Sequence, residues 1–309
     1  MRQIYDDTWR IWAEGLSRAG YERYNRAQLA SPWGSTHLDR VALMDGDTVL
    51  ASAKRYRLTL RVNGANAVAI GIGAVFTSPA LRGRGHGAAI VEEIIAGAAN
   101  DGAHYALLFS EIDPAFYARL GFEPIPIAEA TLLLKMQKRE GAPAVLMRDG
   151  ADRDLDNISA MHEDRASQYA FSLRRDPDYV RFAISKRRLL AASGPPGLRH
   201  VEFFVTEEGG NAVAYVVVTR GPEGHVLEEW GDRDPSGARA GAMLQALAAR
   251  TPAEDVAPLR TWLPADFHPP QLDRASEKPA AEQGMIRGIG RPAPALDAGG
   301  VFYLKADAF

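Results

Sequence analysis

The sequence contains no cysteine, which excludes disulfides, thiol nucleophiles and cysteine-ligated metal sites. No apolar run is long enough to span a bilayer, and the N-terminal stretch MRQIYDDTWRIWAEGL is acidic and amphipathic, without the apolar core of a secretory signal. The formal net charge is only −3, so the charge balance does not indicate a nucleic-acid or anionic-membrane partner. We therefore expect a cytoplasmic protein that binds neither nucleic acid nor membrane.

The length indicates two domains, because 309 residues are more than one hydrophobic core usually organises. The stretch QKREGAPA at 137–144 is charged and then bears glycine and proline, which is typical of a boundary. The order of predicted elements is similar on its two sides, which suggests a weak internal duplication. We expect domains at 1–140 and 143–309, and the sequence leaves a homo-oligomer open.

The first half alternates between strand and helix patterns. A helix over 5–18 and a further helix or loop precede strands at 40–44, 48–62 and 67–77, which are joined by the turns DGD and NGAN and form an antiparallel meander. A helix follows, then the apolar strand HYALLFS at 104–110, which predicts a parallel pair with a right-handed crossover. DPAFYARL predicts a short helix capped by Asp113. FEPIPI and ATLLLKM are expected to close this sheet.

The stretch TSPALRGRGHGAAIVEEII places three glycines and two arginines directly before an apolar helix. A helix N-terminus offers unpaired N–H groups and a partial positive charge, so an anion can bind there if no side chain blocks it. Gly83, Gly85 and Gly87 remove the side chains, and Arg82 and Arg84 add cationic donors. The stretch predicts an anion cradle. It lacks the Gly-Lys-Ser/Thr of a P-loop, and the antiparallel meander before it does not fit a dinucleotide fingerprint.

VFTSPALRGRGHGAA resembles the pyrophosphate loop of the GNAT N-acetyltransferase superfamily, Q/R-x-x-G-x-G/A, with Arg82, Gly85 and Gly87 at its fixed positions. One helix and one strand later, FYARLGF resembles the family's next signature. The two signatures cover about 70–126, and the element order extends the resemblance to about 1–138. The resemblance implies an α/β (α+β) chain of tandem GNAT folds, each a mixed, mostly antiparallel sheet flanked by helices, loosely similar to Eis-type acetyltransferases.

The resemblance implies acetyl-CoA as the acyl donor, with the thiolate that leaves stabilised by Tyr117. Glu111 is either the base that deprotonates the amine or a solvated surface residue. No metal is expected, because MHED at 161–164 has no second pair of ligands at metal spacing. The residues that the resemblance assigns to acetyl-CoA are Val75, Phe76, Thr77, Arg82, Gly83, Arg84, Gly85, His86, Gly87 and Ala88.

The second half resembles a degenerate copy. Where its cradle should be, the sequence reads GDRDPSGARAGA, and Asp232 and Asp234 would repel a pyrophosphate. We therefore expect one acyl-CoA site, in the first half.

The resemblance implies transfer of an acetyl group to a primary amine by direct attack, and we expect a small-molecule amine as the partner. Two alternatives stay open: a non-catalytic acyl-CoA-binding or regulatory protein, and a protein N-acetyltransferase. The acceptor, the acyl-chain preference, the base and the role of the second half do not follow from the sequence.

The last residues, GGVFYLKADAF, form an apolar, strand-like segment. Since exposed tails are usually polar, Val301 to Leu304 are expected to be buried in a sheet, which we take to be the second half's own sheet. The alternative is that the tail continues to the first half and presents the Phe309 carboxylate near its cleft, as Eis-type enzymes are thought to do.

Overall fold

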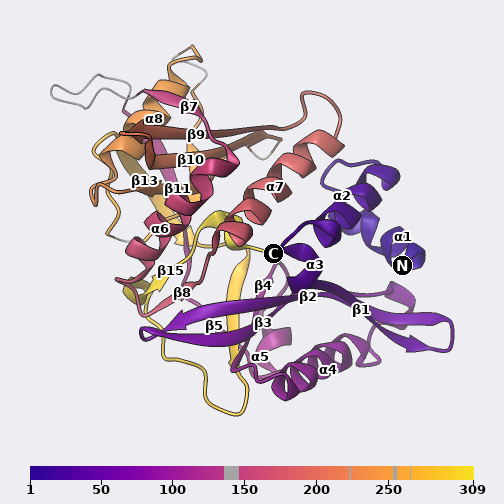
Figure 1. Cartoon of the computed structure of the whole chain (residues 1–309). Helices are drawn as coiled ribbons and strands as arrows, with labels where there is room; N and C mark the ends of the chain where they lie inside the picture. The colour runs from indigo at the N-terminus through magenta and orange to yellow at the C-terminus, as the bar shows by residue number, and fades with distance from the viewer. Residues whose placement is uncertain (136–145, 223, 253–255, 265) are drawn as a thin grey trace.

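The computed structural model describes residues 1–135, 146–222, 224–252, 256–264 and 266–309. Its strands form two sheets, and the helices pack against the faces of the sheets (Figure 1). This mixed α/β arrangement confirms the predicted fold class. The boundary expected at 137–144 lies outside the described residues.

The first sheet is built around the predicted meander. The turn between β2 and β3 has left-handed backbone at Asn63 (φ 48°) and Gly64 (φ 82°), as a tight hairpin turn requires. β3 then pairs in parallel with β4 after the crossover helix α4, as predicted. The sheet has the order β15-β8-β2-β3-β4-β14-β5, with β1 beside β2. Its strands are β1 (Leu38–Asp45), β2 (Thr48–Val62), β3 (Ala65–Thr77), β4 (Tyr105–Ser110), β5 (Glu123–Pro124), β8 (Phe171–Leu173), β14 (Gln283–Gly288) and β15 (Val301–Phe302).

The second sheet repeats the element order of the first. The hairpin of β9 and β10 turns at Gly209 and Gly210, both with positive φ, and β11 pairs in parallel with β12 after helix α8. The sheet has the order β13-β6-β12-β11-β10-β9-β7. Its strands are β6 (Ala128–Leu134), β7 (Met147–Asp149), β9 (His200–Glu208), β10 (Asn211–Gly221), β11 (Gly224–Asp232), β12 (Leu259–Trp262) and β13 (Leu272–Pro279).

The two sheets exchange strands across the expected boundary. β6 pairs with β12 and β13 in the second sheet, while β14 pairs with β4 and β5 in the first. The expectation that ATLLLKM closes the first sheet is therefore wrong. The physical reason is that an alternating apolar strand such as β6, which buries Ala130 and Leu132, fits the open edge of either sheet equally well.

Helices cover both faces of the first sheet. In Figure 1, α4 and α5 lie below the first sheet and α1, α2 and α3 above it, while α7 runs between these and the second sheet. The helices are α1 (Arg2–Trp12), α2 (Arg18–Ala30), α3 (Gly34–His37), α4 (His86–Asn100), α5 (Ala115–Ala118), α6 (Leu155–Ala166), α7 (Pro177–Ser193) and α8 (Ala238–Ala248). Within the described ranges, no helix is both long and apolar enough to cross a membrane.

The C-terminal segment is buried, but in a different sheet from the one expected. Val301, Phe302, Tyr303 and Leu304 are at most 6% exposed, as predicted. β15, however, pairs in parallel with β8, and β8 pairs with β2, so this segment extends the first sheet and the expectation that it closes the second sheet is wrong. A two-residue strand carries too little pattern to specify its partner, because pairing is decided by the side chains that it packs against.

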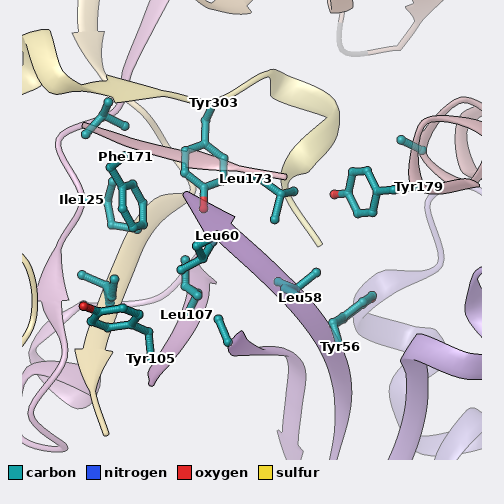
Figure 2. Close-up of a cluster of buried hydrophobic side chains, with 14 of the residues drawn as sticks. Tyr56, Leu58, Leu60, Tyr105, Leu107, Ile125, Phe171, Leu173, Tyr179 and Tyr303 are labelled. Atoms are coloured by element: carbon teal, nitrogen blue, oxygen red, sulfur yellow. The ribbon is translucent and has the colours of Figure 1, made fainter. Parts of the chain in front are cut away.

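One core joins the two halves of the chain. Figure 2 shows the side chains of Leu58 and Leu60 from β2 and Leu107 from β4 gathered with Phe171 from β8 and Tyr303 from the tail. All five are at most 5% exposed. Because these residues come from both halves of the sequence, the first sheet is stabilised by contacts that residues 1–140 alone cannot supply.

The core also contains an ionisable side chain, His162 on α6. It is 3% exposed, stacks on Phe302 and hydrogen-bonds through Nε2 to the Leu173 carbonyl at 3.0 Å. Burial, reinforced by the positive charge of Arg175, lowers the pKa of His162 from 6.5 to about 3. The neutral ring is therefore the form that fits the folded state.

This burial predicts acid sensitivity. The unfolded chain takes up a proton at His162 below pH 6.5 and the folded chain only near pH 3, so stability falls as the pH drops through that window, by about 3 kcal/mol at pH 4. We expect His162→Gln to lose less stability than the unsubstituted protein between pH 6.5 and 4. Urea unfolding at several pH values measures the difference, and parallel pH profiles for the two proteins would contradict it.

Candidate active site

The predicted cradle forms where β3 gives way to α4. Gly83 (φ 77°) and Gly85 (φ 83°) have left-handed backbone, and Gly85 is the N-cap of α4. No side chain caps this helix, and a Cβ added at Gly83 or Gly85 would meet no atom within 4 Å. The first N–H groups of the helix, at His86, Gly87 and Ala88, are therefore open to an anion.

The other cradle residues surround this opening. The exposed Arg82 donates through Nε to the Thr77 carbonyl at 3.2 Å, and Arg84 is also exposed. A Cβ on Gly87 would be 3.4 Å from Thr77 Oγ1, an ordinary contact. Phe76 differs from the rest, because its side chain is buried and meets Trp12 edge to face, so only its backbone is available to a ligand.

A cleft opens between β3 and β4 beside the cradle. The two strands pair only from Ala69 to Gly71, opposite Tyr105 to Leu107, and then separate. In β3 the pairing with β2 shifts register opposite Ala53, and Ala74 there has a φ of 48°, a strained value for a residue with a side chain. The cleft has a volume of about 360 Å³ and is lined on the β3 side by Gly73, Ala74 and Val75. Strand backbone without a neighbour can pair with an extended ligand.

Tyr117 and Glu111 line the same cleft from the β4 side. Tyr117, on α5, is 7% exposed and packs against the rings of Phe116 and Phe122. Burial raises the pKa of Tyr117 to about 12, so its hydroxyl keeps its proton at neutral pH. Glu111 is exposed. Asp113 accepts a hydrogen bond from the Ala115 N–H at 2.9 Å, which is the capping role expected for it.

Charged side chains that the sequence pattern did not single out line the far wall of the cleft. Lys54, on β2, donates to Gln28 Oε1 at 3.3 Å, and Lys186, on α7, donates to the Ala308 carbonyl at 2.8 Å. Burial, together with the nearby Arg187, lowers the pKa of Lys186 to about 7. In the sequence these lysines belong to the charge runs AKRYR and SKRR, which are also typical of solvated faces, so local pattern carries no signal for them.

The tail reaches the cleft. Phe309 lines it together with Tyr117, and the backbone oxygen of Phe309 is 3.1 Å from the position that a Cβ on Gly73 would take. In Figure 1 the C-terminus lies between α7 and the first sheet. The alternative path expected for the tail is therefore the observed one, while a role for a carboxylate there stays a prediction.

The equivalent position in the second half is already filled. Gly237 is the N-cap of α8, but Asp232 Oδ2 accepts the Ala240 N–H at 2.9 Å, and a Cβ on Gly237 would collide with the Phe267 ring. The protein's own carboxylate satisfies the helix N-terminus that an anion would need. Among the described residues, no group of three or more histidine, aspartate and glutamate side chains is placed to hold a metal ion.

This difference predicts the stoichiometry of CoA binding. With α4 open and α8 capped by Asp232, we expect calorimetric titration with excess CoA to give one site per chain. Asp232→Asn keeps an oxygen that can accept the Ala240 N–H, so it serves as the control and should also give one site. A stoichiometry of two in the unsubstituted protein would contradict the degenerate second copy.

Comparison with known proteins gave one family model and several solved structures with a similar fold. The family model for the acetyltransferase (GNAT) domain matches residues 2–125, while a search among curated proteins by sequence gave no match. A GCN5-related N-acetyltransferase from Anabaena variabilis has a TM-score of 0.68 at 12% identity, over 93% of this chain and 70% of that one. Eis1 from Mycobacterium abscessus has a TM-score of 0.57 at 17% identity, over 89% and 72%.

A third similar structure is a tandem GNAT protein from the clavulanic acid biosynthesis pathway, with a TM-score of 0.53 at 16% identity over 94% of this chain and 96% of that one. At these identities the structures show a shared fold, and that fold spans both halves of the chain. The resemblance drawn from the RGRGHG and FYARLGF signatures is thereby confirmed: residues 2–125 match the family model for the acetyltransferase (GNAT) domain, and the chain shares the fold of solved GNAT structures.

Proposed function

We propose that this protein transfers an acetyl group from acetyl-CoA to a primary amine of a small molecule. The observation that carries the proposal is the uncapped N-terminus of α4, which opens beside a cleft containing Tyr117. An anion site next to a cleft with free strand backbone suits a long ligand with a phosphate-bearing end and an extended arm. Acyl transfer as such agrees with the GNAT family of the first half.

The cradle residues would hold the donor. The N–H groups of His86, Gly87 and Ala88 bind the pyrophosphate, and Arg82 and Arg84 add charge at its rim. The backbone of Gly73 to Val75 pairs with the pantetheine arm, which directs the thioester toward Tyr117. The side chains of Val75 and Thr77 border this path, while Phe76 contributes only its backbone, because its ring is buried.

The chemistry needs one proton removed and one charge stabilised. The neutral amine attacks the thioester carbonyl, its nitrogen gives up one proton, the C–S bond breaks, and the sulfur leaves as a thiolate that receives a hydrogen bond from Tyr117. The proton goes to Glu111, to water, or to the carboxylate predicted at Phe309, which are the candidate bases. The product is an amide and free CoA.

The size of the cleft and the elements on both of its sides favour a small acceptor. Its walls come from α1 and α2 on one side and from α7, β11 and the tail on another. A cavity of about 360 Å³ that these elements line together with strands of the first sheet is of the size that holds small ligands. A protein acceptor would call for an open groove along one face.

A panel of small primary amines, assayed with acetyl-CoA by release of free thiol, tests the proposal. We expect at least one amine to raise thiol release well above the rate without an acceptor, and that rate to fall in Tyr117→Phe. Binding of acetyl-CoA without turnover on any amine would instead support the acyl-CoA-binding alternative. Turnover only with lysine-containing peptides would support a protein N-acetyltransferase.

A further inference from the structure

Two glycines on one face of β3 are covered by the last residue of the chain. A Cβ on Gly71 would lie 2.5 and 2.8 Å from ring carbons of Phe309, and a Cβ on Gly73 would lie 3.1 Å from its backbone oxygen. Neither glycine has the positive φ that would itself require glycine. The GIG sequence of β3 is thus explained by the close approach of Phe309 and not by backbone conformation.

The Phe309 ring lies at the point where β3 and β4 separate. Gly71 is the last β3 residue paired with β4, opposite Leu107. The ring centroid of Phe309 is 4.6 Å from that of Tyr56 on β2 and 5.2 Å from that of Phe109 on β4. The three aromatic rings therefore cover the closed end of the cleft on the side of the sheet away from α4.

Buried charges fix the tail that carries this ring. Arg175 is bonded to Glu229 at 2.7 Å and to Asp307 at 3.1 Å, and all three side chains are fully buried. Asp307 also accepts the Leu304 N–H at 3.0 Å, and Lys186 donates to the Ala308 carbonyl. A tail that is held by Arg175 at Asp307 and by Lys186 at Ala308 has little freedom to move Phe309 out of the cleft.

An acyl group longer than acetyl would need a path past this closed end. The sheet face toward α4 is filled by Ile70 and Ile72 of β3, Leu108 of β4 and Ile90 and Val91 of α4, each at most 5% exposed. The other face holds Phe309, which is only partly buried and lines the cleft. Of these side chains that would block a longer acyl group, only Phe309 lies outside the first sheet and α4, in the C-terminal segment.

We propose that the Phe309 ring limits the acyl group of the donor to a short chain. The inference rests on the proposed CoA-thioester donor and adds to it a residue that sets donor specificity. With the ring in place, an acetyl group fits the end of the cleft and a six-carbon chain does not. Removing the ring opens space between Tyr56, Phe109 and the glycines of β3 that methylene groups can fill.

Calorimetric binding of CoA, acetyl-CoA and hexanoyl-CoA tests this without any acceptor. In the unsubstituted protein we expect hexanoyl-CoA to bind at least tenfold more weakly than acetyl-CoA. Phe309→Ala should reduce this ratio of the two affinities at least tenfold. Phe309→Leu removes less volume, so its ratio should lie between those of the unsubstituted protein and Phe309→Ala. Phe204→Ala, at a partly buried phenylalanine on β9 in the second sheet, is the matched control and should keep the original ratio.

Thermal unfolding of each variant shows whether it folds. If Phe309→Ala does not fold, Phe309→Leu tests the inference. An unchanged ratio in a folded Phe309 variant overturns the inference, as does equal binding of the two thioesters by the unsubstituted protein. If neither CoA nor acetyl-CoA binds to the unsubstituted protein, the proposed function fails instead. The two failures are therefore distinguishable.

Discussion

Gly85→Val is expected to weaken CoA binding at least about 100-fold while leaving the fold intact. A Cβ added at Gly85 would point into open space. A phosphate needs this space to reach the first N–H groups of α4. Losing even one or two charge-assisted hydrogen bonds, at roughly 1.5–3 kcal/mol each, gives a change of this size, since 1.4 kcal/mol is about tenfold. Calorimetric titration with CoA measures it.

The matched control for this variant is Gly102→Val. Gly102 follows α4, has a φ of 80° against 83° for Gly85, and its Cβ would also meet no atom within 4 Å. Valine at either position carries the same left-handed strain of about 1–2 kcal/mol, but only Gly85 belongs to the cradle. We expect similar losses of thermal stability and a loss of CoA affinity in Gly85→Val alone. Full affinity in a folded Gly85→Val protein would exclude the loop as the pyrophosphate site.

The features that sequence predicted are the ones encoded locally. The meander of β1, β2 and β3 follows from alternating residues and from turn residues such as Asn63 and Gly64, whose left-handed backbone the structure contains. The cradle follows from glycine spacing next to an apolar helix, and Tyr117 from a short motif. Each depends on residues within about fifteen positions of one another, where spacing alone determines which side chains share a face.

The features that sequence did not predict depend on contacts between distant segments. The exchange of β6 and β14 between the sheets and the pairing of β15 with β8 are choices among edges that present the same backbone hydrogen-bonding groups. Lys54 and Lys186 line the same cleft although 132 positions separate them in the chain. No local pattern distinguishes these lysines from exposed ones.

In the second half, the structure gives Asp232 a role that the sequence did not predict. Asp232 was expected to repel a pyrophosphate by its charge. In the structure its carboxylate accepts the N–H groups of both Asp234 and Ala240, so it caps α8 and takes the place of an anion. Repulsion alone would leave the helix N-terminus unsatisfied, whereas capping stabilises the fold by about 1 kcal/mol.

The prediction for Tyr117→Phe follows from the order of two pKa values. Burial raises the pKa of Tyr117 to about 12, whereas an ordinary thiol has a pKa of about 8.5. A complete proton transfer from this phenol to the departing thiolate is therefore uphill, and the hydroxyl acts mainly as a hydrogen-bond donor to the developing negative charge. Such a bond is worth roughly 1.5–3 kcal/mol, so we expect kcat to fall about 10- to 100-fold.

The affinity for CoA should be unchanged in Tyr117→Phe, because the ring still packs between Phe116 and Phe122 and the cradle is intact. Tyr5→Phe is the matched control: Tyr5 is also buried, its hydroxyl has no hydrogen-bond partner among the described residues, and it does not line the cleft. Since the hydroxyl of Tyr117 stays protonated until the pH approaches 12, the unsubstituted protein should lose no activity through this group up to pH 10, and the ratio of its kcat to that of Tyr117→Phe should stay constant from pH 7 to 10. A variant with full kcat at pH 7 would show that Tyr117 does not assist the leaving thiolate, and a ratio that collapses to one above pH 8 would show that its hydroxyl ionises well below pH 12.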